Sequence, residues 1–142
     1  MTDHEIIHAL RERVRKLQFM RYLDGDIYSV SHERKEAVLA FHPREDLCQT
    51  AGVIQGGFVT AMLDGAMAHA VLVASDMTLG PPTLELKVSF LRPALPGPHK
   101  AVGRVVRMGK SIGFLEGELF NDKDELIAKS SATAMLVPSA PA

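Results

Sequence analysis

The sequence has almost none of the cysteine that stabilises secreted proteins and no excess of charge of either sign. Its 142 residues contain no tryptophan and one cysteine, Cys48, so no intrachain disulfide can form, and we expect a reducing compartment, the cytoplasm. The 16 lysines and arginines nearly balance 17 acidic residues, and the net charge of −1 gives no reason to expect binding to nucleic acid or to an anionic membrane.

Long hydrophobic runs are also lacking. The longest, 58–74, is short for a membrane span and includes Asp64 and His69. The N-terminal segment mixes acidic residues with its arginines and lysines and has no apolar centre, so it resembles neither a secretory signal nor a transit peptide. We therefore expect a soluble protein that does not bind a membrane.

What is present indicates one globular domain over residues 1–142. Apolar residues make up 46% and charged residues 23% of the chain, an ordinary globular composition, and the length suffices to bury a core. Within 3–18, apolar side chains recur every three or four positions from Ile6 to Leu17. This spacing predicts an amphipathic surface helix within residues 1–20.

The expected core, residues 25–137, contains one long helix and six strand-like runs. The helix is expected at 57–75, where an almost unbroken apolar segment ends at a Gly-Pro stop signal. Strands are expected at 26–33, 36–43, 82–91, 99–108, 112–121 and 125–137. This order predicts an α+β fold in which a small-residue face of the helix lies against one face of an antiparallel sheet.

Two patterns resemble reactive sites but have simpler explanations. The segment HEIIH at 4–8 matches the zinc-protease pattern H-E-x-x-H, yet it lies at a chain end, where a rigid metal site is hard to hold. We expect a solvated helix face there and no metal. Cys48, with His42 within loop range, could be a nucleophile, but it adjoins no group that lowers a thiol pKa, so we expect a small, partly buried residue.

Asp64 is the residue that the apolar pattern does not explain. It stands in the middle of the predicted helix, where an ionised carboxylate needs a partner. His69 follows at a spacing that resembles the enoyl-CoA hydratase dyad, but on a helix five residues separate two side chains by about 140°, so the pair could not share a substrate. From the pattern alone, Asp64 is either a structural buried acid or a catalytic group.

A Gly-Gly pair before the helix favours catalysis. Gly56 and Gly57 leave the first N–H groups of the helix uncovered, and such groups can polarise a carbonyl oxygen and stabilise the oxyanion formed from it. We expect Asp64, about two turns further along, to reach the same substrate carbon. A carboxylate beside an oxyanion donor can hydrolyse an acyl bond.

The segment GVIQGGFVTAMLDGAMAHAV resembles the central helix of the hotdog-fold acyl-CoA thioesterases of the PaaI-like, phenylacetate-pathway type. In that family an Asn is followed three residues later by a Gly. His-Gly-Gly or Gln-Gly-Gly comes next, and an Asp lies nine residues after the His or Gln. The segments TLELKVSFLRPALPG and 104–136 resemble the remaining strands in length and turn placement. The resemblance covers roughly 25–137 and implies a hotdog fold, a long central helix wrapped by an antiparallel sheet.

The resemblance implies a role for each matching residue around the helix. Asp64 would be the general base or nucleophile. The Gly56 N–H would bind the thioester oxygen, with Gly57 continuing the helix start. Gln55 stands where many members have His, and Gln49 stands where the family has Asn, so that an amide is kept on a longer side chain.

The resemblance also implies a reaction and an assembly. Thr83 matches a Ser or Thr that helps to place the attacking water and that the partner subunit supplies in this family. Arg107 and Lys110 could contact the phosphates of CoA or form an ordinary basic turn. The implied reaction is hydrolysis of an acyl-CoA to free acid and CoA, without metal or cofactor, in a homodimer or a homotetramer made of two dimers.

Two other functions remain open at this point. A non-catalytic acyl-CoA-binding protein would keep the pocket but need no carboxylate at the reacting carbon, so Asp64 favours an enzyme. A hydratase or dehydratase on the same fold would need an acid–base pair that converges on the acyl chain, which the helical spacing of Asp64 and His69 disfavours.

Overall fold

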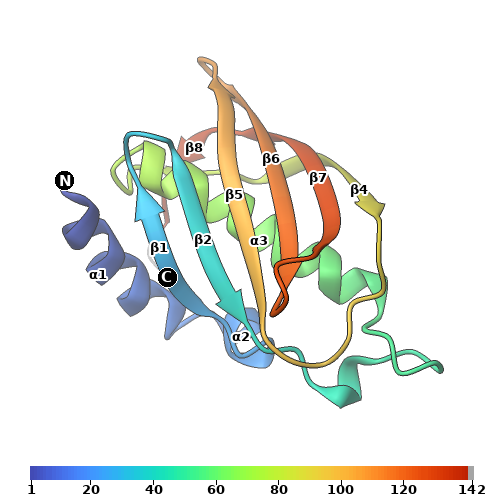
Figure 1. Cartoon of the computed structure of the whole chain (residues 1–142). Helices are drawn as coiled ribbons and strands as arrows, with labels where there is room; N and C mark the ends of the chain where they lie inside the picture. Colours follow the sequence, from blue (N-terminus) through green and yellow to red (C-terminus); the bar gives the residue numbers. More distant parts are fainter. Residues whose placement is uncertain (141–142) are drawn as a thin grey trace.

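The computed structural model describes residues 1–140 and shows an antiparallel sheet curved around one long helix (Figure 1). The sheet consists of β1 (Asp26–Ser31), β2 (Glu36–Phe41), β4 (Thr83–Phe90), β5 (His99–Met108), β6 (Ile112–Asn121) and β7 (Leu126–Met135). These strands pair in the order β1-β2-β5-β6-β7-β4, so β1 and β4 form the edges. The predicted α+β hotdog architecture is confirmed.

The helix α3 (Gly56–Ala74) lies across the inner face of the sheet (Figure 1). Its close approach depends on Gly103 of β5, because a Cβ at that position would overlap the Ala66 carbonyl group of the helix. By length and composition α3 could cross a membrane, but 61% of its most apolar window is buried inside the fold. The requirements of the core therefore explain its hydrophobicity.

The N-terminal segment forms two helices where the sequence predicted one. The helix α1 (Asp3–Val14) ends before the predicted limit, and Leu17 is extended, with φ −91° and ψ 109°, at the start of α2 (Gln18–Tyr22). The prediction of a continuous helix over 3–18 is wrong at this point. The helix is interrupted there, and Met20 on the far side of the break is still buried in the core.

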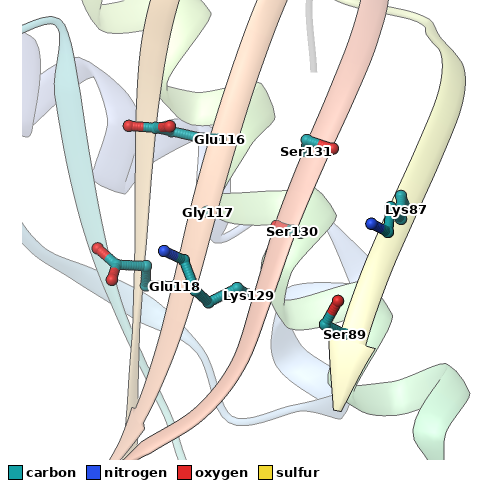
Figure 2. A pocket seen from close by; sticks show the side chains of 8 residues that line it. All are labelled: Lys87, Ser89, Glu116, Gly117, Glu118, Lys129, Ser130 and Ser131. Carbon is teal, nitrogen blue, oxygen red and sulfur yellow. The ribbon is translucent and has the colours of Figure 1, made fainter. Parts of the chain in front are cut away.

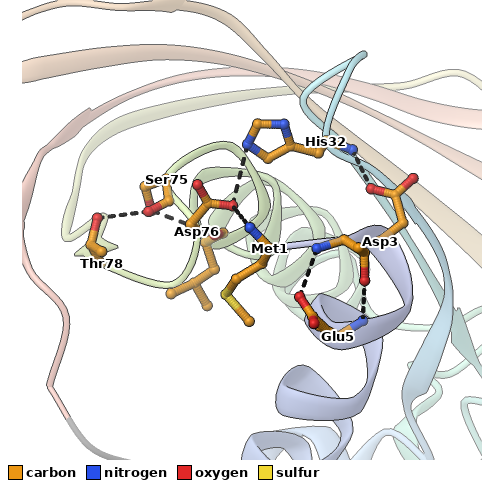
Figure 3. Close-up of polar contacts among 9 residues, drawn as sticks. Met1, Asp3, Glu5, His32, Ser75, Asp76 and Thr78 are labelled. Carbon is orange, nitrogen blue, oxygen red and sulfur yellow. Dashed lines mark hydrogen bonds and ion pairs between the residues drawn. The ribbon is translucent and has the colours of Figure 1, made fainter.

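Polar contacts hold the beginning of the chain against the end of α3 (Figure 3). The α-amino group of Met1 lies 3.5 Å from Asp76 Oδ1, and His32 Nε2 lies 3.4 Å from the same oxygen. The His32 N–H donates a hydrogen bond of 2.9 Å to Asp3. These contacts join α1, the β1–β2 turn and the C-terminal end of α3.

The other boundaries differ little from expectation. The strands predicted at 99–108 and 112–121 coincide with β5 and β6. The strand predicted at 125–137 divides into β7 and the short β8 (Val137–Pro138), which pairs with β3 (Leu79–Gly80). The predicted loop at 44–55 contains a short 3-10 helix, Glu45–Leu47.

Candidate active site

Asp64 lies on the half-buried face of α3 and has a hydrogen-bond partner. The hydroxyl of Thr83, at the start of β4, donates to Asp64 Oδ1 at 2.8 Å. Both residues belong to the same chain. The helix supplies the carboxylate and the edge strand orients it, so the isolated acid of the sequence has the partner that its position requires.

The start of α3 offers a backbone donor. The side chain of Gln55 caps the helix, its Oε1 accepting the Gly57 N–H at 2.7 Å, while its carbonyl accepts the Phe58 N–H at 2.9 Å. Within residues 1–140, no acceptor hydrogen-bonds the Gly56 N–H. Gly56 is therefore the donor that a substrate oxygen can use, whereas Gln55 already occupies the N–H of Gly57.

Gly56 and Gln49 line one groove of about 440 Å³ at this helix end. The groove also includes Phe90, whose ring would lie 3.2 Å from a Cβ on Gly56, and Arg92 just after β4. No sequence motif singles out Phe90 or Arg92. Their place at and just after the end of β4 is the one feature of the sequence that could have indicated them.

The structure separates the candidate residues into two groups. Thr83 and Asp64 form one group, and Gln49, Gln55 and Gly56 form the other. Asp64 comes eight residues after Gly56, which corresponds to about 12 Å along a helix axis. A thioester carbonyl needs its base and its oxyanion donor at about 3 Å each, so this separation disfavours the expectation that both groups of one chain reach one carbon, which stays a prediction.

The expectation that Thr83 meets Asp64 from the partner subunit also needs correction. The two side chains are hydrogen-bonded within one chain, at 2.8 Å. The physical reason is the position of β4: it is an edge strand of the same sheet, and its first residue lies next to the middle of α3. Asp64 and Gly56, by contrast, are about 12 Å apart along the axis of α3 in one chain.

Arg107 and Lys110 are exposed at the β5–β6 hairpin. The register pairs Thr83 with Ala134, Ala134 with Gly113, and Gly113 with Met108. The hairpin and its two basic side chains therefore lie at the same end of the sheet as Thr83 and Asp64.

His69 is a core residue and does not face a substrate with Asp64. Its side chain is 3% exposed, and Nδ1 makes a 2.7 Å hydrogen bond with the Gly65 carbonyl. Burial lowers the pKa of His69 to about 4, since the charged ring would lose its hydration. A neutral histidine fixed to its own helix fits the structural role expected for it.

The remaining sequence patterns also have structural roles. In HEIIH, Glu5 accepts the Thr2 N–H at 2.9 Å and Thr2 accepts the Glu5 N–H, a capping box at the start of α1. Among residues 1–140, no group of three or more His, Cys, Asp or Glu side chains could hold a metal ion. Cys48 is half-buried and forms a β-bridge with Ile54.

A separate pocket of about 360 Å³ lies on the sheet and includes neither candidate group (Figure 2). Lys87 of β4 and Lys129 of β7 line it together with Glu116 and Glu118 of β6, and Lys129 extends toward Glu118 (Figure 2). The two lysines and two glutamates balance in charge, and the pocket has no helix N–H group to bind an acyl carbonyl. We therefore place the candidate site at the start of α3 and not here.

A partnered carboxylate and an uncovered N–H on the helix of a hotdog sheet suit the hydrolysis of thioester or ester bonds, and the family of the chain agrees. The chain belongs to the thioesterase superfamily, whose family model matches residues 51–128. A relative from Saccharolobus solfataricus, named "Putative esterase", is 31% identical over 119 residues, which is 83% of this chain and 82% of the relative.

Solved structures agree with the PaaI-like resemblance. A phenylacetic acid degradation-related protein from Ralstonia eutropha has a TM-score of 0.79 and 30% identity, covering 86% of this chain and 95% of that one. The Escherichia coli PaaI protein shares the fold, with a TM-score of 0.87, 19% identity and 99% of each chain covered. The smu.793 protein from Streptococcus mutans, solved with bound acetyl-CoA, also shares the fold. Its TM-score is 0.71 and its identity 16%, with 81% of this chain and 90% of that chain covered.

Proposed function

We propose that the protein hydrolyses acyl-CoA thioesters to the free acid and CoA in the cytoplasm, with Asp64 as general base or nucleophile. The observation that carries the proposal is the 2.8 Å hydrogen bond from Thr83 to Asp64 on the helix of a thioesterase-superfamily fold. A carboxylate held by one donor keeps lone pairs free for a water molecule or for direct attack.

In the general-base form, Asp64 takes a proton from water while the water oxygen bonds to the thioester carbon. The carbonyl electrons move onto oxygen, and the Gly56 N–H of a second copy stabilises that oxyanion. The intermediate then collapses, the C–S bond breaks, and the CoA sulfur leaves with the proton that Asp64 holds. The reaction uses side chains, backbone and water, and needs no metal or cofactor.

The proposed enzyme is a homodimer, or a tetramer of two such dimers. About 12 Å of helix separates Asp64 from Gly56 in one chain, so the oxyanion donor for Asp64 has to come from another copy. The strand β4, which carries Thr83, is an edge strand with unpaired backbone groups on one side. A two-fold axis beside β4 would create two equivalent sites, each with Asp64 and Thr83 from one chain and Gly56 and Gln49 from the other.

The CoA part of the substrate would extend toward the β5–β6 hairpin. Arg107 and Lys110 lie at the same end of the sheet as Asp64 and are free of ion pairs within residues 1–140. Their charges suit the phosphates of CoA. The complex of smu.793 with acetyl-CoA supports a CoA-type ligand for this fold.

The test is a screen for thiol release from short, long and aromatic acyl-CoAs. We expect turnover of some member of the set, and we expect Asp64→Asn to lower kcat at least about 100-fold while circular dichroism and melting stay those of the wild type. Asp122→Asn, on the exposed β6–β7 turn, is the matched control. Full activity of a folded Asp64→Asn variant would remove the catalytic assignment. Binding without any hydrolysis would instead support the acyl-CoA-binding protein.

A further inference from the structure

The first turns of α3 contain a threonine whose hydroxyl is bonded to the backbone of its own helix. The Thr60 hydroxyl donates to the Gly56 carbonyl at 2.8 Å, one turn back along the chain. Bonds of this kind slightly destabilise a helix and often bend it, and threonine is a weaker helix former than alanine. The stability of the helix therefore does not explain the contact, which acts on the residue that carries the proposed oxyanion donor.

Gly56 does not hold its own N–H in one direction. Glycine has no Cβ and adopts a wider range of φ and ψ than other residues. A side chain that would restrict this range is crowded out, because a Cβ on Gly56 would lie 3.2 Å from the Phe90 ring. An N–H group stabilises an oxyanion best when it already points at the place where the charge develops. The direction of the Gly56 N–H must therefore come from the groups around it.

Hydrogen bonds hold both peptide groups that flank the Gly56 Cα. The first peptide group joins the Gln55 carbonyl to the Gly56 N–H, and that carbonyl accepts the Phe58 N–H at 2.9 Å. The second joins the Gly56 carbonyl to the Gly57 N–H, which donates to Gln55 Oε1 at 2.7 Å. Thr60 supplies the side-chain contact at the carbonyl end of this second group. Since each peptide group is planar, fixing both groups fixes φ and ψ of Gly56.

We propose that Thr60 is a positioning residue that fixes the Gly56 N–H as the oxyanion donor. This inference rests on the proposed function, which takes that N–H as the group that meets the thioester oxygen. Thr60 lies one turn from both Gly56 and Asp64 on the same side of α3, and it acts through the peptide group between Gly56 and Gly57. Its loss should weaken transition-state stabilisation and leave substrate binding nearly unchanged.

The first test removes the hydroxyl and keeps the shape of the side chain. With the acyl-CoA that is hydrolysed fastest in the screen, Thr60→Val is expected to lower kcat about 10-fold or more and to change KM less than about twofold. Thr60→Ser keeps the donor and should retain most of the activity.

The matched control for this test is Thr78→Val. The Thr78 hydroxyl makes the same kind of contact, donating to the Ser75 carbonyl at 2.7 Å, but it lies just beyond the other end of α3 (Figure 3). Removing it should leave kcat and KM at their wild-type values.

The second test does not depend on turnover. It uses nuclear magnetic resonance of protein labelled only at its 11 glycines, in which the Gly56 signal is the one that Gly56→Pro lacks. In Thr60→Val the order parameter of the Gly56 N–H is expected to fall below that of the wild type, because the peptide group after it is less firmly held. In Thr60→Ser and Thr78→Val it should not change.

The outcomes separate the two proposals. If the wild type hydrolyses no acyl-CoA but Thr60→Val lowers the Gly56 order parameter, the catalytic proposal fails and the control of Gly56 by Thr60 stands. An unchanged order parameter in Thr60→Val, or equal losses of kcat in the Val and Ser variants, would overturn the positioning role. A loss of kcat that comes with a lower Tm or with dissociation in size-exclusion chromatography would also overturn it, because the hydroxyl would then serve the fold or the assembly.

Discussion

At the scale of single residues, Asp64 shows how an isolated acid in an apolar helix is accommodated. The Thr83 hydroxyl supplies one hydrogen bond, of 2.8 Å, and leaves the carboxylate half-buried on the helix surface. A hydrogen bond to a charged group contributes roughly 1.5–3 kcal/mol. Thr83 is therefore a positioning residue for Asp64 in the proposed reaction.

Replacing Thr83 should affect turnover more than binding. In Thr83→Val the methyl shape is kept and the donor is lost, so we expect kcat to fall about 10-fold or more, with KM nearly unchanged, in steady-state assays. Thr83→Ser keeps the hydroxyl and should retain most of the activity. Equal rates for the Val and Ser variants would show that the hydrogen bond has no role in turnover.

Buried histidine should make stability depend on pH. The pKa of His69 is lowered to about 4 by burial, from 6.5, and burial also lowers the pKa of His99. Below pH 6.5 the unfolded chain takes up a proton that folded His69 does not accept until about pH 4. Stability is thus complete above pH 6.5 and falls as the pH decreases toward 4, by up to about 1.4 kcal/mol per pH unit for this group.

The measurement is urea unfolding between pH 7 and pH 4.5. His69→Gln can still donate to the Gly65 carbonyl but does not titrate, so its stability should decline less steeply with falling pH than that of the wild type. The comparison uses slopes, which an overall loss of stability in the variant does not alter. Parallel slopes would mean that His69 is not the titrating group.

At the scale of elements, the sequence predicted those with strong periodicity and missed those that depend on tertiary contacts. The strands β5 and β6 and the helix α3 have clear patterns and turn signals on both sides. The break at Leu17 has no glycine or proline to mark it, and the apolar repeat continues across it to the buried Met20. The pair β3 and β8 is two residues long on each side, too short for an alternating pattern.

The contact between α3 and β5 predicts a sharp difference between two glycines. In Gly103→Ala the new methyl group would overlap the Ala66 carbonyl, and neither backbone can move away alone, so we expect a loss of about 3 kcal/mol or more in urea unfolding. In Gly80→Ala the nearest atom would lie 3.7 Å away, and the change should be small. Similar losses in both variants would contradict the close helix–sheet contact.

At the scale of the whole molecule, the sequence supplies candidate site residues but does not show which of them lie together. The short spacing from Gly56 to Asp64 in the sequence suggests nearness, whereas on a straight helix it is a separation of about 12 Å. The contact of Thr83 with Asp64 depends on which edge of the sheet β4 occupies. Strand order is a long-range property that the local pattern of Thr83 does not contain.

The proposed grouping predicts which pairs of inactive variants rescue one another. Gly56→Pro removes the N–H at the first position of α3, where proline is tolerated, and Gln55 before it has the compatible φ of −61° and ψ of 138°. If Gly56→Pro and Asp64→Asn are refolded together, mixed dimers contain one intact site. With random pairing about half the dimers are mixed, so about a quarter of the wild-type activity should return.

The control mixture combines Asp64→Asn with Thr83→Val. Since these two residues serve the same site from the same chain, every site in a mixed dimer carries one substitution, and no rescue is expected beyond the average of the parents. Rescue in this mixture and none with Gly56→Pro, after verified subunit exchange, would show that the sites are grouped differently.

The strand order also determines when the proposed active site becomes complete as the chain folds. The strands β5, β6 and β7 follow one another through short turns and pair as neighbours, so they can assemble by fast local contacts. The strand β4 precedes them in sequence but pairs with β7, beyond both β5 and β6, and this pairing closes a long loop. Thr83 therefore reaches Asp64 only after the meander has formed, and a partly folded chain has its carboxylate without the hydroxyl that orients it.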